Sequence, residues 1–423
     1  MNAVFLTFLT VAVTFMGTTN AFAEILKEDL CRTPPFVSAK ISPDGRLIAQ
    51  VGADEMGIMN VSLISIKGDH SNSQKLSFFE TPEIIQFFWS ADSKKVLLLK
   101  DENGTGQLNL HGFDVQSKNH ISYTEHFPKV NAKIIKLSSK ENKAIVGLNQ
   151  RNPHFHDLYL LDLNSGDLTF LLENNTFAQF LVSEDLEIIL KMQINSDGSW
   201  TVFTNDDKVF VNLSSEDAFQ TEFLSYDSNA NAIYMLDNRS SNTNQLTKKL
   251  LASSFKEEVL GRQSYSDVDE VLFIDGKPQA YASYYTQKKW HVLDPSVEKD
   301  INFLEKQTGT NFEIVSQSQD NKIWIVSNSI PDKGDYFWIY QRKVHSLVQL
   351  APSNSDRSLK EDFSKMYEMI AKARDGEELV CYYTLPKEYD KGGYVDFPIP
   401  LVVVPHGGPF KVRDKFKFNR YHQ

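Results

Sequence analysis

The residues best suited to chemistry lie near the C-terminal end of the sequence. The apolar run of residues 399–404 leads into Pro405-His406-Gly407-Gly408-Pro409. Glycines let the backbone turn sharply after a strand and aim N–H groups at an oxygen that gains negative charge during acyl transfer. His406, Gly407 and Gly408 are therefore candidate oxyanion-hole residues. A tight loop after a strand also favours glycines, so this motif alone leaves a purely structural role open.

An acyl-transfer reaction also needs an attacking group and a base. The nucleophile-elbow pattern Gly-x-Ser-x-Gly occurs nowhere in the 423 residues. We therefore expect a segment without catalytic residues of its own, which is inactive alone.

Two other polar clusters contain residue types that could bind a metal ion. His154-Phe155-His156-Asp157 has the His-x-His spacing that places two imidazoles on one face of a strand, yet its place after Asn152-Pro153 favours a turn between strands. The loop that begins Asp101-Glu102-Asn103-Gly104 departs from the calcium-loop pattern and predicts a hairpin turn. We expect neither a metal nor an organic cofactor.

The elements that would position the His-Gly-Gly motif follow from the preceding residues. A continuous apolar run such as residues 399–404 suits a strand buried on both faces of an α/β sheet. The strands and helices that would cover residues 401–404 are largely absent, so we expect their apolar surface to be exposed and prone to association unless a partner covers it. Residues 379–386 predict a strand that follows the turn Arg374-Asp375-Gly376. Residues 359–371 predict an amphipathic helical stretch or a loop, and helices are nearly absent before them.

A repeated phrase runs through the middle of the chain: an apolar residue, Ser, a short polar turn, and then an alternating apolar strand. The first copy is Ile41-Ser42-Pro43-Asp44-Gly45. The later copies are looser, and Ile274 stands in place of Ser in the sixth. The second positions of the seven copies are residues 42, 90, 138, 183, 225, 274 and 318, which lie 48, 48, 45, 42, 49 and 44 residues apart. A period of about 40–50 residues with several strands per unit is typical of β-propellers. We expect one face of each alternating strand to be buried against the next blade.

The N-terminus predicts export. Residues 4–16 are almost wholly apolar, and Ala21-Phe22-Ala23 supplies a cleavage pattern for signal peptidase. We expect cleavage after Ala23 and a periplasmic or secreted protein without a membrane span. No Lys or Arg precedes the apolar stretch, so an uncleaved membrane anchor stays open as an alternative.

Composition excludes several classes of function. Apolar residues make up 41% and charged residues 23%, as in folded globular proteins. The net charge of -11 argues against a nucleic-acid partner, because phosphate binding requires a basic surface. Cys31 and Cys381 are the two cysteines, and they could pair in an oxidising compartment.

The order of these features resembles the prolyl oligopeptidase family of serine peptidases, and in particular its acylaminoacyl-peptidase and dipeptidyl-aminopeptidase branch. The resembling residues are Ala373-Arg374-Asp375-Gly376, Tyr383-Thr384-Leu385-Pro386 and residues 400–409, continued by Arg413-Asp414 and Phe418-Asn419. Phe416 stands where that branch usually has Trp. The resemblance covers the whole mature chain, loosely over the repeats and closely from Tyr367 onward.

The resemblance implies an all-β, seven-bladed β-propeller followed by the incomplete start of an α/β-hydrolase domain. The boundaries that we expect are residues 1–23 for the signal peptide, 24–36 for an N-terminal segment, 37–358 for the propeller and 359–423 for the hydrolase part. It also implies hydrolysis of short peptides near their N-terminus, without a cofactor, by Ser, Asp and His in that chain order.

Three interpretations remain open. The chain is a truncated peptidase, one half of a split peptidase that a separate chain completes, or a periplasmic propeller that binds peptides or proteins without catalysis. Short peptides are the expected ligands if the peptidase is complete.

Overall fold

The computed structural model describes residues 36–420 except for 55, 69, 71, 81–83, 102–103, 128, 252–256, 351–362 and 409–411. The predicted signal peptide and Cys31 lie outside the described residues, so cleavage and the Cys31–Cys381 disulfide stay predictions. Within the described residues, none of the helices combines the length and the apolar composition that crossing a bilayer requires.

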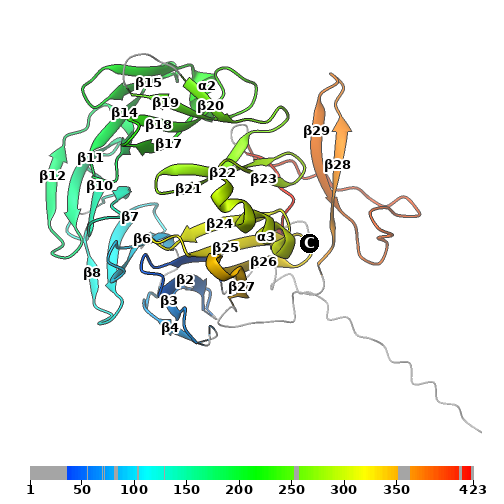
Figure 1. The fold of residues 1–423 in the computed structure, drawn as a ribbon, viewed down its shortest axis with the longest axis horizontal. Helices are drawn as coiled ribbons and strands as arrows, with labels where there is room; N and C mark the ends of the chain where they lie inside the picture. The colour runs from blue at the N-terminus through cyan, green and yellow to red at the C-terminus, as the bar shows by residue number, and fades with distance from the viewer. Residues whose placement is uncertain are drawn as a thin grey trace, which may run out of the picture.

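Seven antiparallel sheets form a β-propeller, and Figure 1 shows them arranged around a common centre. Blade 1 is formed by β1 (Ser38–Ile41), β2 (Leu47–Ala53), β3 (Met59–Ser65) and β4 (Ser73–Lys75). Blade 2 is formed by β5 (Ile84–Trp89), β6 (Lys95–Asp101), β7 (Leu108–Asp114) and β8 (His120–Ser122). Blade 3 is formed by β9 (Ala132–Leu137), β10 (Lys143–Asn152), β11 (Phe155–Asp162) and β12 (Leu168–Leu172).

The other four blades follow in the same order along the chain. Blade 4 has β13 (Phe177–Val182), β14 (Ile188–Ile194), β15 (Trp200–Thr204) and β16 (Val209–Leu213), and blade 5 has β17 (Glu222–Asp227), β18 (Ala232–Asp237), β19 (Gln245–Leu250) and β20 (Glu257–Gly261). Blade 6 has β21 (Val268–Ile274), β22 (Lys277–Tyr284) and β23 (Lys288–Val292). Blade 7 has β24 (Phe312–Gln317), β25 (Ile323–Ile330), β26 (Gly334–Gln341) and β27 (Ser346–Gln349).

The repeated phrase forms the turn between the first and second strands of a blade. In blade 1 the Ser42 hydroxyl donates to Asp44 Oδ1 at 2.6 Å and accepts the N–H of Leu47 at 3.0 Å. Gly45 follows with a φ of +70°, which suits a residue without Cβ. Ser90 with Asp92 and Ser318 with Asp320 form the same contacts in blades 2 and 7. The predicted turn chemistry is confirmed for these copies.

Two later copies depart from the Ser-containing turn, although the turn of the sixth copy lies at Asp275-Gly276 as predicted. Ser225 lies inside β17, and Asp227 at the end of that strand accepts the N–H groups of Asn229 and Ala230 instead. In blade 6 a two-residue turn, Asp275-Gly276, joins β21 to β22 with φ values of 50° and 73°. An Asp side chain can hold a turn as a Ser hydroxyl does, so the marker Ser is not required.

The hydrophobic core lies between the blades. The described residues form seven buried apolar clusters, one at each interface between neighbouring blades. Successive residues of β6 point to opposite neighbours: Leu98 packs with blade 1 and Leu97 with blade 3, and both are fully buried. The expected burial of one face against the next blade is confirmed, and in the middle strands the opposite face is buried as well, because each blade lies between two others.

The ring closes between blades 1 and 7 without an exchanged strand among the described residues. All four strands of each blade are consecutive in sequence. The Gln319 N–H donates to the Pro43 carbonyl at 2.8 Å, and the Ile41 N–H donates to Ser316 Oγ at 3.0 Å. Ile48 and Ile325 pack across this interface, so side-chain packing and a few hydrogen bonds close the ring.

Helical segments complete blade 6, where sequence analysis predicted almost none. A 3₁₀ turn, η1 (Pro295–Val297), leads into α3 (Glu298–Thr308), which occupies the place of a fourth strand. Ile301 and Leu304 of α3 are buried in the core between blades 6 and 7. The shorter helix α2 (Ser215–Gln220) connects blades 4 and 5, and a further 3₁₀ turn, η2 (Arg342–Val344), precedes β27.

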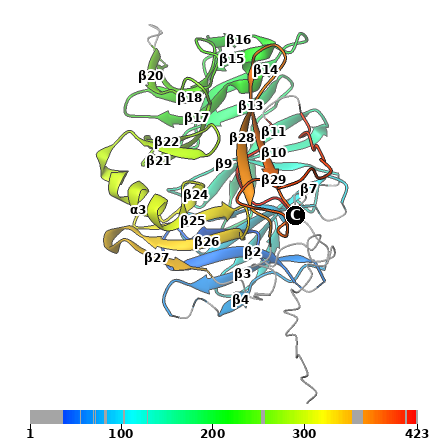
Figure 2. The ribbon, with the colours of Figure 1, turned by 90° about the vertical axis from the view of Figure 1, so that its right-hand side faces the viewer.

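After blade 7 the described chain forms a two-stranded hairpin, β28 (Met366–Lys372) and β29 (Glu378–Thr384). The prediction of a helix or loop over residues 359–371 is wrong for residues 366–371, which belong to β28 because they pair with β29. The described residues 363–365 form a loop, as the second alternative expected. The predicted strand and the turn at Gly376, whose φ is +96°, are confirmed. Figure 1 shows the hairpin outside the ring, and Figure 2 shows it crossing in front of the propeller.

We call the side of the propeller that carries this hairpin the hairpin face. The loops between the second and third strands of the blades open on it, and the β22–β23 loop contacts the hairpin: Tyr382 donates to the carbonyl of Thr286 at 2.6 Å. The Ser-containing turns open on the opposite face. Residues 401–404 form no strand with any described segment, contrary to the prediction, and they are 84%, 81%, 75% and 59% exposed, as expected without a covering partner.

Candidate functional site

The His-Gly-Gly motif lies in the open segment that follows the hairpin. His406 is half-exposed, and its Nδ1 lies 3.0 Å from Asp414 Oδ2. Apart from its two chain neighbours, none of the described residues places a heavy atom within 4 Å of the position that a Cβ would take at Gly407. Gly408 is also exposed. The motif is therefore open to an incoming group, and the oxyanion role of His406, Gly407 and Gly408 stays a prediction.

The segment after the motif is anchored to blades 6 and 7 on the hairpin face. Lys415 Nζ lies 2.7 Å from Asp269 Oδ2 at the start of β21. Asn311 donates to the Phe416 carbonyl at 2.6 Å, and the Phe418 N–H donates to Ser329 Oγ at 3.0 Å. Arg413 also donates to the backbone carbonyl of the β22–β23 loop. These contacts hold residues 412–420 against the propeller.

The hairpin contributes a second set of contacts with the same loop. Gln287 donates to Glu368 Oε2 at 3.2 Å, and Tyr285 donates to Glu378 Oε2 at 3.3 Å. Burial raises the pKa of Tyr382, whose hydroxyl contacts this loop, to about 12. Tyr382 is therefore a neutral donor at physiological pH.

A pocket of about 510 Å³ lies between the anchored segment and blades 1, 6 and 7. Its wall combines aromatic rings, amides and charged groups, including Phe337, Phe418, Asn328, Lys288 and Glu313. Such a mixture suits a ligand that carries both apolar side chains and backbone polar groups.

One wall of this pocket holds a buried charge cluster. Lys288 is 3% exposed and pairs with Glu270, and its Nζ lies 4.0 Å from Glu313. Burial raises the pKa of Glu270, although the Lys288 ammonium opposes this effect. Because Lys288 is compensated by these carboxylates, it is part of the wall rather than a free cation.

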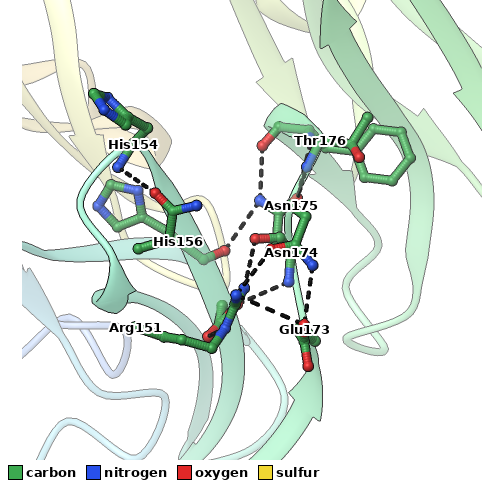
Figure 3. Close-up of polar contacts among 10 residues, drawn as sticks. Arg151, His154, His156, Glu173, Asn174, Asn175 and Thr176 are labelled. Atoms are coloured by element: carbon green, nitrogen blue, oxygen red, sulfur yellow. Dashed lines mark hydrogen bonds and ion pairs between the residues drawn. The ribbon is translucent and has the colours of Figure 1, made fainter.

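The residues around the His154–Asp157 cluster link two loops of the hairpin face through hydrogen bonds (Figure 3). Arg151 donates to both carboxylate oxygens of Asp157 at 2.9 and 2.7 Å, to Asn175 Oδ1 at 2.8 Å and to the Asn174 carbonyl at 2.9 Å. The hydrogen bonds to Arg151 hold the pKa of Asp157 below its usual range, although burial opposes this. The turn interpretation is supported, since Asp157 is committed to Arg151.

The two histidines of this cluster have different surroundings. His154 is exposed and its N–H donates to Asn152 Oδ1, whereas burial lowers the pKa of the half-buried His156 to about 4. Nowhere in the described part of the chain do three or more His, Cys, Asp or Glu side chains gather as metal ligands would. In the Asp101 loop, the carboxylate accepts the N–H groups of Thr105 and Gly106, as expected of a hairpin turn.

No family model matches the sequence. The chain is 29% identical over 409 residues to dipeptidyl aminopeptidase BIII of Pseudoxanthomonas mexicana, which covers 94% of this chain and 58% of that protein. It is 23% identical over 438 residues to dipeptidyl peptidase family member 6 of Caenorhabditis elegans, with coverage of 95% and 59%.

A solved prolyl endopeptidase structure has the same fold, with a TM-score of 0.61 at 12% identity over 86% of this chain and 56% of that one. The chain is a relative of the prolyl oligopeptidase family. The resemblance stated from the motifs is thereby confirmed, and so is the seven-bladed propeller. The chain spans less than two thirds of the length of these peptidases.

Sequence analysis missed the residues that anchor the C-terminal segment. Asp269, Asn311 and Ser329 contact residues that lie 146, 105 and 89 positions later in the chain. No local pattern identifies such partners. Their shared position at strand ends on the hairpin face becomes visible only once the blades are placed.

Proposed function

We propose that this chain provides the propeller and the oxyanion-hole segment of a serine peptidase that cleaves short peptides near their N-terminus. The observation that carries the proposal is the anchoring of the segment that follows the His-Gly-Gly motif, residues 412–420, to the hairpin face beside a pocket of about 510 Å³. The relationship to dipeptidyl peptidases supports the reaction class.

In this proposal the N–H groups at Gly407 and Gly408 stabilise the negative oxygen of a tetrahedral intermediate. The pocket between blades 1, 6 and 7 holds part of the peptide, and the propeller restricts access to short or unstructured chains. The attacking Ser, its His base and the Asp come from polypeptide outside the 423 residues, because these residues contain no Gly-x-Ser-x-Gly.

Two experiments test this proposal. The first is to read the gene beyond the codon for Gln423, in all frames and in neighbouring reading frames, for Gly-x-Ser-x-Gly followed by Asp and His. The second is to assay the chain alone, and then joined to or mixed with that region, on dipeptidyl and N-acylaminoacyl chromogenic substrates. Hydrolysis only with the added region supports the proposal, whereas a coding region without the triad favours a propeller that binds peptides without catalysis.

We also propose that the protein is exported. The apolar stretch of residues 4–16 and Ala21-Phe22-Ala23 support this. N-terminal sequencing of protein from the periplasm or medium should find Glu24 first, and protein that keeps Met1 in the cytoplasm would contradict it.

A further inference from the structure

Lys40 occupies an unusual place in the propeller. It belongs to β1, the innermost strand of blade 1, and its side chain lines a small pocket of about 190 Å³ with Ile85, Phe87 and Phe88. Its Nζ lies 5.0 and 4.7 Å from the ring centroids of Phe87 and Phe88. It donates a hydrogen bond to the Phe87 carbonyl at 2.8 Å.

The charge of Lys40 has no carboxylate partner among the described residues. Two other buried lysines do have one: Lys191 lies 2.5 Å from Asp207, and Lys288 pairs with Glu270. An ammonium has three donors, and the contacts of Lys40 within the described chain use one of them. Burial also lowers the pKa of Lys40, as expected when no anion compensates the charge.

The surroundings of Lys40 indicate the chemistry of the missing group. The pocket beside the ammonium is walled by apolar side chains, including Val51 and Ile85. Val37 and Met59 line both this pocket and the larger pocket under the C-terminal segment, so the two adjoin. A ligand in the larger pocket could therefore extend to Lys40, where an anionic end would meet the cation and an apolar side chain would meet the wall.

We propose that Lys40 binds the C-terminal carboxylate of a short peptide whose last side chain is apolar. The inference rests on the proposed function for the peptide class, and it adds a site that selects the free C-terminus. A charged hydrogen bond in a partly desolvated site discriminates well between a carboxylate and a neutral amide. Short peptides with a free, apolar C-terminal residue are then preferred over longer chains that continue past this point.

The alternative is that the Lys40 side chain only joins blade 1 to blade 2. The Trp89 indole N–H already donates to the Lys40 backbone carbonyl at 2.9 Å, and this contact does not need the side chain. A purely structural lysine would therefore affect stability but would not distinguish a carboxylate from an amide.

The test is a binding measurement that needs no catalysis. The purified chain is titrated by calorimetry with N-acetyl-alanyl-phenylalanine and, separately, with its C-terminal amide. We expect the acid to bind about tenfold more tightly than the amide. Lys40→Met should abolish that preference and leave the affinity for the amide unchanged, whereas Lys40→Arg should keep it. Lys75→Met is the matched control, because Lys75 also lies over an aromatic ring, in the outermost strand of the same blade.

Equal affinities of the wild-type chain for acid and amide, or no binding of either, would overturn the inference, even if a variant fails to fold. The outcome is separate from that of the proposed function. A preference for the acid without any peptidase activity after completion of the hydrolase domain would refute the function alone, and activity without the preference would refute the Lys40 site alone.

Discussion

Two leucines show how differently the two regions of this chain are built. Leu98 in β6 of the propeller is fully buried between blades 1 and 2, whereas Leu401 after the hairpin is 84% exposed. Both stand in strongly apolar stretches, Val96-Leu97-Leu98-Leu99 and Leu401-Val402-Val403-Val404. The propeller supplies its own cover on both sides of each blade, but the described residues supply none for residues 401–404. An apolar run therefore predicts burial only where the fold provides a neighbouring layer.

The comparison also separates two kinds of contact with the propeller. Within the ring, every blade interface has its own apolar cluster. The C-terminal segment is held mainly by hydrogen bonds and an ion pair at strand ends of blades 6 and 7. We infer that the ring is the stable unit and that the segment contributes little to its stability.

The same substitution made in both regions tests this difference in burial most strongly. Leu98→Ala leaves a cavity in the core between blades 1 and 2 and should lower the free energy of unfolding by about 2–5 kcal/mol. Leu401→Ala should change it by less than about 0.5 kcal/mol, because the side chain is already in water. Denaturant unfolding followed by tryptophan fluorescence measures both, and equal losses would contradict the comparison.

A second prediction concerns the hydrogen bonds of Arg151 and Asp157 that link the β10–β11 and β12–β13 loops. Asp157→Asn should destabilise the propeller by about 1.5–3 kcal/mol at pH 7, because charged hydrogen bonds to Arg151 are lost. The folded-state pKa of Asp157 is lowered from 3.8, so its contribution is present above pH 4 and is lost as the pH falls through the folded-state pKa.

The pH dependence supplies the control for that prediction. Wild type and Asp157→Asn should therefore converge in stability as the pH falls below about 4. A difference that stays constant from pH 7 to pH 3 would show that the Asp157 charge is not responsible.

A smaller effect is expected at the anchor of the C-terminal segment. Asp269→Asn removes the ion pair with Lys415, whose partners are both partly exposed, and should weaken the attachment by about 0.5 kcal/mol. Amide hydrogen exchange over residues 412–420 should become about twofold faster while exchange in the blades is unchanged. Faster exchange in blade 6 as well would show that the segment stabilises the ring.

The smallest change in stability is expected for Val403→Lys. Because Val403 is 75% exposed, the free energy of unfolding should stay within about 0.5 kcal/mol of wild type. Self-association, measured by light scattering, should fall, since exposed apolar runs promote association. Val209→Lys, at an exposed valine of blade 4, is the matched control and should leave self-association unchanged.

Much of the propeller could be predicted from the sequence because each blade carries a local turn signal. Ser42, Ser90 and Ser318 hold their turns as expected, and the spacing between copies matches the blades. Helix α3 was missed although its own signals were present: Asp294 caps the preceding turn, Pro295 follows it, and Ile301 and Leu304 lie on one helical face. A repeat pattern of strands predicts a further strand at this place in blade 6 and so conceals these helix signals.

The candidate site was less predictable. The His-Gly-Gly motif is a local pattern, so residues 406–408 could be named in advance. Lys40 carries no local signal, since its surroundings come from the strand of the next blade. The exposure of residues 401–404 could also be predicted, because the neighbouring strands and covering helices of that run are largely missing from the sequence. The strand itself was predicted from composition, but it does not form with any described segment.

The measurement that tests the central claim most directly is labelling with a fluorophosphonate probe, which reacts with activated serines. The 423-residue chain should remain unlabelled, because it contains no Gly-x-Ser-x-Gly, and a polypeptide completed with the rest of the hydrolase domain should be labelled at one serine. Labelling of the 423-residue chain itself, or no labelling of the completed polypeptide, would contradict the account.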